Sequence, residues 1–473
     1  MRRTRRLVGL ALAGALVLSG CAGHARAGAG GAPAEAEKQA NREAREAEAR
    51  LAEHSESRGQ QTPEEEQAER DAFAQRAIQA LRAAGETRDI HYDAAGFLLR
   101  LGSKTGGNAD DTVFLGNFFD EYLATAPEQQ EEVLSRLTRV RAMPTLPKTF
   151  AEVRPNLLPV VRGRAFFEQL WLVVKGGPDT SAPVSWKPVD GFLGACLAFD
   201  GPDTLQYLGP NELARWGVSF DEAFTVALEN LRQRSTEALE QLTPGTCLAP
   251  WEDSYASSRL LLDEVVRRCK VRGTPVVLVP HRDLLLITGS EDEDGLRQVA
   301  TRALRAVMAP RALDGRALRL TASGWVPFMP ERLSNAWADF RKLELFTRTR
   351  DYEEQTRRLE KLYAEKGEDL FVAAYTPYQD ERGRSISYAV WLKGVDALLP
   401  RAEVIFFMDP ALGEEAPPVG IARWEDVAKV AGDMLVPVKG LYPERYRVKG
   451  FPTEEQLAGW QNDPGDLFDE DGP

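Results

Sequence analysis

A histidine, an arginine and an aspartate stand side by side in the stretch LVPHRDLLLITGS, residues 278–290, between two aliphatic runs. An imidazole changes its charge near neutral pH, and a carboxylate close to it can orient the ring. Such a pair can serve as the general base of a hydrolase, with His281 as the base and Asp283 or a distant carboxylate as its partner. His281, Arg282 and Asp283 are therefore the candidate catalytic residues, although no complete catalytic constellation accompanies them.

The same triplet also fits a turn between two strands. Pro280 cannot donate to a strand ladder and suits a strand edge or a turn, while the carboxylate of Asp283 can accept backbone N–H groups where the next strand begins. The letters HRDL also resemble the start of the protein-kinase catalytic loop, but the asparagine of that loop would fall at Thr288, and no Asp-Phe-Gly motif follows. The sequence favours the structural turn.

A second copy of this pattern supports the turn. Residues 398–407 align without gaps to residues 278–287 and keep the apolar flanks. The copy retains the proline and an acid as Pro400 and Glu403, but Arg401 stands where the first copy has histidine. Each copy is predicted to be a turn that leads into a buried strand.

Other motifs that carry chemistry are incomplete. The letters LGSKT at 101–105 follow a predicted strand as a phosphate-binding loop would, but they lack the glycine that such a loop places ahead of its lysine. The chain has 4 histidines, of which His24 and His54 precede the folded part, leaving His91 and His281. The sequence has no paired-cysteine zinc pattern, so no metal site and no cofactor are predicted.

Residues 1–20 predict a secretory signal peptide. A basic arginine cluster is followed by an apolar stretch, 7–18, that is too short to span a bilayer. The letters LSGC that end at Cys21 resemble the bacterial lipobox, whose cysteine receives a diacylglyceryl group and becomes the first residue. Ala22 follows, not the aspartate that signals inner-membrane retention. The resemblance implies a lipoprotein anchored through Cys21 to the outer membrane and facing the periplasm.

Charge and cysteine content narrow the partners. The formal net charge is -13, and an acidic chain without a basic cluster repels phosphate, so nucleic acid is excluded as a partner. Two partners remain possible: the membrane, through the lipid on Cys21, and an envelope protein. Three further cysteines are an odd number, which in an oxidising compartment predicts at least one thiol that is free or bonded to another molecule. Cys196 fits a buried strand, and a bridge from Cys247 to Cys269 is compatible with the compartment but not required by their spacing.

The folded part is predicted to have two units after an Ala/Glu/Arg-rich tether at 21–61. The first unit, 62–340, opens with a helix that starts at Thr62-Pro63 and stops near Gly85. Its other predicted elements are a hairpin around 94–96, two helices within 112–140, strands at 157–163, 169–176, 191–200 and 205–208, and helices at 219–241 and 254–268.

The second unit, 341–456, is predicted to contain a polar helix at 351–366, a hairpin with Gly383 in its turn, a strand at 403–409 and a helix at 424–435. An acidic tail occupies 457–473. Because helices and strands do not alternate strictly, the predicted fold class is α+β, with mixed or antiparallel sheets and packed amphipathic helices.

Several short motifs in 89–328 are similar to the YtpQ-like family, domain of unknown function 1444. They are YDAAGFLLRL, LLPVVRGRAFF, ALENLR, DSYASSRLLLDEVV and, above all, VPHRDLLLIT. The family has no established activity, so the resemblance implies a shared domain and no reaction. The lipoprotein signal and the long C-terminal region depart from the simplest members.

Two functions of different classes follow from these observations. The first is a non-enzymatic envelope lipoprotein whose two units bind a protein or another envelope component, and the lack of a complete catalytic constellation favours it. The alternative is an envelope hydrolase that uses His281 and Asp283.

The lipobox generates a direct prediction. Cys21→Ala should leave the precursor uncleaved or release the protein from the membrane, because no acylated cysteine remains to anchor it. Membrane fractionation and the mass of the N-terminal peptide measure both effects. Normal processing and membrane association of the variant would contradict the prediction.

Overall fold

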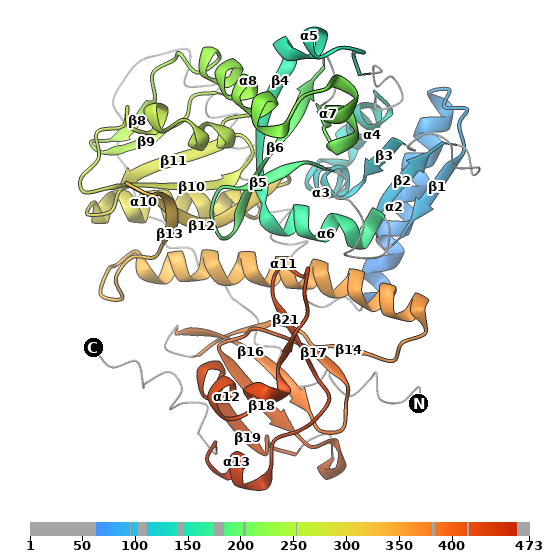
Figure 1. Ribbon diagram of the computed structural model, residues 1–473, viewed down its shortest axis with the longest axis vertical. Helices are drawn as coiled ribbons and strands as arrows, with labels where there is room; N and C mark the ends of the chain where they lie inside the picture. The colour runs from blue at the N-terminus through green and yellow to red at the C-terminus, as the bar shows by residue number, and fades with distance from the viewer. Residues whose placement is uncertain are drawn as a thin grey trace.

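Helix α11, Trp337–Lys366, crosses the molecule between two bodies built from sheets and helices (Figure 1). Residues before α11 form the larger body, and residues after it form the smaller one. Antiparallel and mixed sheets with packed helices confirm the predicted α+β class. The computed structural model describes residues 63–94, 96–102, 111–139, 146–174, 184–201, 205–251, 253–380, 384–413 and 416–460. The predicted signal peptide, the lipidation site Cys21, the tether and most of the acidic tail lie outside these ranges.

The larger body begins with the predicted entry helix. Helix α2 spans Pro63–Ala83, and Gly85, with a φ of 90°, ends it in the left-handed conformation that glycine adopts easily. Phe73, Ala77 and Leu81 lie on one face and are at most 3% exposed. They share a core with β1 (Ile90–Asp93), β2 (Leu98–Leu101), β3 (Asp111–Phe114), α3 (Gly116–Ala124) and α4 (Gln130–Thr138).

Two sheets form the main core of the larger body. The first has the strand order β4-β6-β5 with β7 beside β6, and the second has the order β13-β12-β10-β11-β9-β8. The first sheet consists of β4 (Leu157–Gly163), β5 (Trp186–Pro188), β6 (Leu193–Asp200) and β7 (Leu205–Tyr207). The second consists of β8 (Glu240–Thr243), β9 (Thr246–Leu248), β10 (Pro275–His281), β11 (Leu284–Gly289), β12 (Ala312–Thr321) and β13 (Gly324–Phe328).

The second sheet is covered on both faces. Val277 of β10 packs in the core shared with the first sheet, whereas its neighbours Val276 and Leu278 pack against α10 (Glu293–Ala306) and α11. Successive side chains of a strand point to opposite faces, so a strand buried on both faces is apolar throughout. This explains the aliphatic runs on either side of the histidine. Leu286 of β11 lies fully buried on the helix-covered face.

Two predicted elements of the larger body are wrong. The apolar letters QLWLVVKG were predicted to be a strand, but residues 169–174 belong to helix α6, Arg164–Val174, and the last two letters lie outside the described residues. A short apolar run fits a strand or a buried helix equally well, and here Phe167 and Leu170 are three residues apart on the buried face. The predicted helix at 254–268 is a 3₁₀ helix, η5 (Ser257–Leu261), followed by the short α9 (Asp263–Val266).

The predicted capped helix is confirmed. Helix α8 spans Phe220–Gln233, and Ser219 and Glu222 form the reciprocal capping box. It packs on the first sheet with α7, Pro210–Trp216. It ends earlier than predicted, because residues 240–243 belong to strand β8.

The smaller body contains two four-stranded sheets of order β14-β17-β21-β20 and β15-β16-β18-β19. The predicted hairpin is present as β15 and β16, although Gly383 in its turn lies outside the described residues. The strands are β14 (Phe371–Val372), β15 (Thr376–Gln379), β16 (Ser385–Leu392), β17 (Ala397–Pro400), β18 (Val404–Met408), β19 (Gly420–Arg423), β20 (Val436–Pro437) and β21 (Arg445–Val448), and the helices are α12 (Trp424–Val430) and α13 (Glu454–Ala458).

The internal correspondence is reproduced only in part. In both copies the segment after the turn is a strand, β11 in the larger body and β18 in the smaller one. Strands β10 and β11 pair as an antiparallel hairpin. In contrast, β17 and β18 belong to different sheets. The two copies share the turn and the strand that follows it, but not the pairing of the strand before.

Polar contacts attach both bodies to α11. Arg316 of β12 pairs with Asp314 at 2.7 Å and with Asp351 of α11 at 3.4 Å. From the other side, the fully buried Arg445 of β21 donates through Nε to Gln355 of α11 at 2.6 Å.

Among the described helices, none is both long and apolar enough to cross a membrane.

The packing of the second sheet generates a stability prediction. Leu286→Ala should lower the free energy of unfolding by about 2 to 5 kcal/mol, because it leaves a cavity between β11 and the helices. Leu333→Ala is the matched control, since Leu333 is 98% exposed and should change stability by less than about 0.5 kcal/mol. Urea unfolding of the two variants measures the difference. Equal midpoints would contradict this description of the core.

Candidate functional site

The His-Arg-Asp triplet lies in the turn that joins β10 to β11. His281 is the last residue of β10 and is paired with Leu284, the first residue of β11. A register shift between Leu278 and His281 loosens the hairpin just before the turn. The main chain of the turn is also held from outside the hairpin, because Ser257 of η5 donates its N–H to the carbonyl of Arg282 at 3.0 Å.

Both ring nitrogens of His281 are engaged in hydrogen bonds. Nδ1 accepts the backbone N–H of Asp283 at 3.1 Å, so the proton of the neutral ring resides on Nε2, which donates to the carbonyl of Pro310 at 2.8 Å. Burial lowers the pKa of His281 below its ordinary value, which favours this neutral form. His281 therefore closes the turn and ties it to the segment that leads into β12.

The carboxylate of Asp283 does not accept the backbone N–H groups that the sequence predicted for it. Its Oδ1 atom is sealed from solvent and has no hydrogen-bond partner among the described residues. Its Oδ2 atom lies 3.8 Å from Nδ1 of His281, beyond hydrogen-bonding distance. The prediction failed because the imidazole, which is a closer acceptor, takes the N–H of the turn.

The guanidinium of Arg282 is half-buried and unpaired. It makes no side-chain hydrogen bond or ion pair within the described part of the chain, and its Nε atom is sealed from solvent. Burial and the nearby charges of Arg162 and Arg311 lower the pKa of Arg282 to about 10. A cation in this position lacks the partner that normally offsets the loss of water.

Arg162 and Tyr207 come from the first sheet and lie near Arg282. Arg162 of β4 is 4% exposed and donates through Nε to the hydroxyl of Tyr207 at 2.9 Å and through Nη1 to the carbonyl of Val161 at 2.7 Å. The N–H of Val161 donates to Ser258 Oγ at 3.1 Å. Sequence reasoning did not single out Arg162 or Tyr207. The one available signal was a charged residue at the end of the buried strand LLPVVRG.

The 3₁₀ helix η5 brings these two parts together. Its consecutive residues Ser257 and Ser258 bond to the main chain at Arg282 and beside Arg162, respectively. The cluster formed by Arg162, Tyr207 and Arg282 is called the arginine cluster below. It lies where the turn of the second sheet meets the ends of β4 and β7 in the first sheet.

A basic depression lies in another part of the second sheet, beside α10. Five cationic side chains line it: Lys270, Arg272, Arg297, Arg302 and Arg305. Asp292 and Asp294 also line it, and Asp292 pairs with Arg272 at 2.5 Å. This local gathering of positive charge was not predicted, because its members come from separate segments of an acidic chain.

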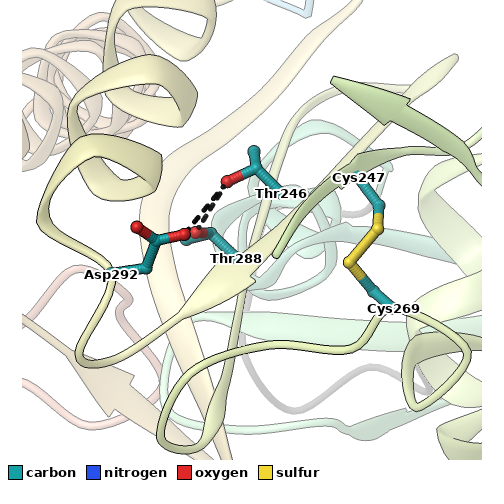
Figure 2. Close-up of a disulfide and its surroundings, with 5 residues drawn as sticks. All are labelled: Thr246, Cys247, Cys269, Thr288 and Asp292. Atoms are coloured by element: carbon teal, nitrogen blue, oxygen red, sulfur yellow. Dashed lines mark hydrogen bonds between the residues drawn. A yellow bond between two sulfur atoms is a disulfide. The ribbon is translucent and has the colours of Figure 1, made fainter. Parts of the chain in front are cut away.

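The edge of this depression is reinforced by a disulfide and a polar network (Figure 2). Cys247 and Cys269 are bonded, so the bridge that the sequence left open is present. The hydroxyls of Thr246 and Thr288 lie 3.1 Å apart, and the Thr246 hydroxyl is 3.5 Å from Asp292, which also caps α10. Cys196 is a buried free thiol, as its apolar strand predicted.

Titratable groups are not grouped for metal binding. No set of three or more His, Cys, Asp or Glu residues in the described ranges could hold a metal ion. The LGSKT stretch falls mostly outside those ranges. Of the predicted candidate residues, the structure places His281, Arg282 and Asp283 together in one turn, beside Arg162 of the first sheet.

The two hydrogen bonds of His281 generate a prediction for stability and its pH dependence. His281→Ala should lower the free energy of unfolding by about 1 to 2 kcal/mol at pH 7.5, because it removes two neutral hydrogen bonds. The folded pKa of His281 is below the ordinary value of 6.5, so the stability that His281 contributes is present above that value and declines as the pH falls below it. The wild type should lose more stability between pH 7.5 and 5.5 than the variant does.

Asp283→Asn is the matched control for the neighbouring position. The substitution keeps the shape of the side chain but removes the charge that favours the neighbouring guanidinium, and no hydrogen bond to Oδ1 is lost. It should therefore lower the free energy of unfolding by less than His281→Ala does. Thermal and urea unfolding of the three proteins at both pH values measure these effects. A His281→Ala variant as stable as the wild type at pH 7.5 would show that the imidazole does not hold the turn.

Comparisons with family models, with curated proteins and with solved structures find no match to this chain. The resemblance to the YtpQ-like family therefore remains an expectation drawn from its short motifs.

Proposed function

We propose that this chain is a bacterial envelope lipoprotein that works as a non-enzymatic binding module. Its lipid anchor would be the acylated Cys21, which holds it on the outer membrane with the folded bodies in the periplasm. The basic signal segment and the lipobox letters at 18–21 support the anchor. The disulfide between Cys247 and Cys269 is compatible with an oxidising compartment outside the cytosol.

One observation carries the choice of binding over hydrolysis. In the turn, His281 is the possible base and Asp283 the possible acid, but both ring nitrogens of His281 already bond to main-chain groups. Arg282, which stands between these two residues in the sequence, has no side-chain partner in the described chain. A general base needs a free lone pair within about 3 Å of the proton that it removes. An unpaired guanidinium needs only a ligand with hydrogen-bond acceptors. The turn is therefore better equipped to bind than to transfer a proton.

The position of the turn supports the same role. Turns held by a rigid scaffold are common places for binding residues, because the scaffold keeps their side chains in place. Here the scaffold consists of two sheets and η5, and its backbone contacts fix the turn from three sides: β10 with β11, Pro310, and Ser257.

Complementation separates binding from hydrolysis. In a strain that lacks the gene and has an envelope defect, Arg282→Gln should fail to restore the wild-type phenotype at normal abundance, while His281→Gln should restore it. The Cys21→Ala protein should also fail, because it is not placed at the membrane.

The hydrolase alternative predicts the reverse order. A folded His281→Gln protein that is present at normal abundance and cannot restore the phenotype would contradict the binding role. So would full restoration by Arg282→Gln.

A further inference from the structure

The arginine cluster holds more positive charge than its surroundings neutralise. Arg162 and Arg311 are both close enough to Arg282 to act on it electrostatically. The charge of Arg311 is shared with Glu121, which lies 3.3 Å away and also pairs with Arg136. The carboxylate of Asp283 favours the charge of Arg282 electrostatically, but within the described residues no carboxylate forms an ion pair with Arg282 or Arg162. A half-buried surplus of positive charge is costly unless an anion neutralises it.

The cluster offers hydrogen-bond donors and few acceptors. Neither Nη group of Arg282 nor Nη2 of Arg162 has a partner in the described ranges. Tyr207 accepts from Arg162 Nε, so its own O–H hydrogen is left to donate, and the described chain supplies no acceptor for it. Ser257 is fully buried beside this turn, and its Oγ atom is unpartnered among the described residues as well. Apart from the Oδ1 atom of Asp283, which is an acceptor without a partner in the described chain, the unpartnered groups here can donate, and such a set of donors matches an oxyanion.

Two fully buried arginines of the described chain, Arg259 and Arg445, have partners for all of their nitrogens. Arg259 is fully buried and bonds to both carboxylate oxygens of Asp253, to Ser235 Oγ and to a main-chain carbonyl. Arg445 is bonded through all three of its nitrogens. These two arginines are therefore accounted for by hydrogen bonds within the fold. Arg282 differs from both.

The cluster is fixed before any ligand arrives. Ser257 and Ser258 hold the main chain near Arg282 and Arg162, and His281 closes the turn. Nε and Nη1 of Arg162 are already anchored, which orients its guanidinium. A ligand that binds here does not need to order the backbone, so less of its binding energy is lost to conformational entropy.

Building on the binding role proposed above, we propose that Arg282, Arg162 and Tyr207 form a binding site for a small oxyanion group, a carboxylate or a phosphate, of an envelope molecule. The planar guanidinium fork suits both groups, which it can bind through two parallel hydrogen bonds. Arg282 supplies its free Nη groups, Arg162 supplies Nη2, and Tyr207 supplies its hydroxyl hydrogen.

Anion binding to the purified lipidated protein in non-ionic detergent tests the site. Inorganic phosphate and acetate are titrated separately by calorimetry, with sodium chloride added to keep the ionic strength constant. The wild type should bind at least one of them saturably, and the anion that saturates at the lower concentration identifies the preferred group. Arg282→Gln should weaken that binding by about tenfold or more, as expected for the loss of a charged hydrogen bond.

Two control variants separate this site from general charge and from folding. Arg302→Gln removes an exposed cation from the basic depression and should bind the anion as the wild type does. Arg259→Gln should lower the melting temperature, because it breaks a saturated buried network. Without added anion, Arg282→Gln should melt at the wild-type temperature or above it, because it relieves an unpaired charge.

Three results would overturn the inference: no saturable binding of either anion by the wild type, equal binding by Arg282→Gln, or a melting temperature of Arg282→Gln that falls as far as that of Arg259→Gln. These failures are distinct from failure of the binding role. If Arg282→Gln fails in complementation but neither anion binds to the wild type, the binding role stands and the oxyanion site is rejected.

Discussion

The arrangement of the two bodies depends on the cost of removing an arginine from water. Arg316 and Arg445 reach α11 from the two bodies: Arg316 contacts Asp351 there in addition to Asp314 of its own strand, and Arg445 contacts Gln355 and Thr356. A buried guanidinium that loses a partner costs several kcal/mol, so neither body can shift along α11 without a large loss. The helix is polar along much of its length, and these contacts add to the packing of its buried apolar residues against both bodies.

The cost of burying an arginine without a partner also applies to Arg282. A fold that supplies two carboxylate oxygens to Arg259 and several neutral acceptors to Arg445 leaves Arg282 unpaired within the described chain. Breaking a local rule of this kind costs stability, and such departures are concentrated at functional sites. Its neighbour Arg162 adds to the cost, since two like charges near each other lower the pKa of Arg282 further than burial does alone.

Sequence reasoning succeeded where the signal was local and failed where it was tertiary. The capping box of Ser219 predicted the start of α8, and the glycine and proline positions predicted α2, because these features act within one turn of chain. The apolar letters of α6 carry no such local signal, so a strand and a helix could not be separated. Only the last half of α11 was predicted, because the first half is held by Phe340, Leu343 and Leu345, whose packing partners lie far away in sequence. The arginine cluster was missed for the same reason: β4, β7 and the turn meet only after folding.

A comparison of the two copies of the turn shows why the sequence singled out His281, and not Arg282, as the residue with a chemical role. In the second copy, Glu403 accepts the N–H of Ser387 at 2.8 Å and its hydroxyl at 3.0 Å, and it also pairs with Arg341. The backbone N–H that it accepts therefore belongs to the neighbouring strand β16 and not to the start of its own strand, as was expected. In the first copy the imidazole takes over the turn N–H and leaves the carboxylate without that role. The imidazole of His281 bonds to the main chain of its own turn and to Pro310, so a residue chosen for its catalytic potential proves to be engaged by the backbone. The position after it is a buried alanine in the smaller body and Arg282 in the larger one. What distinguishes the first copy chemically from its purely structural counterpart is therefore the arginine.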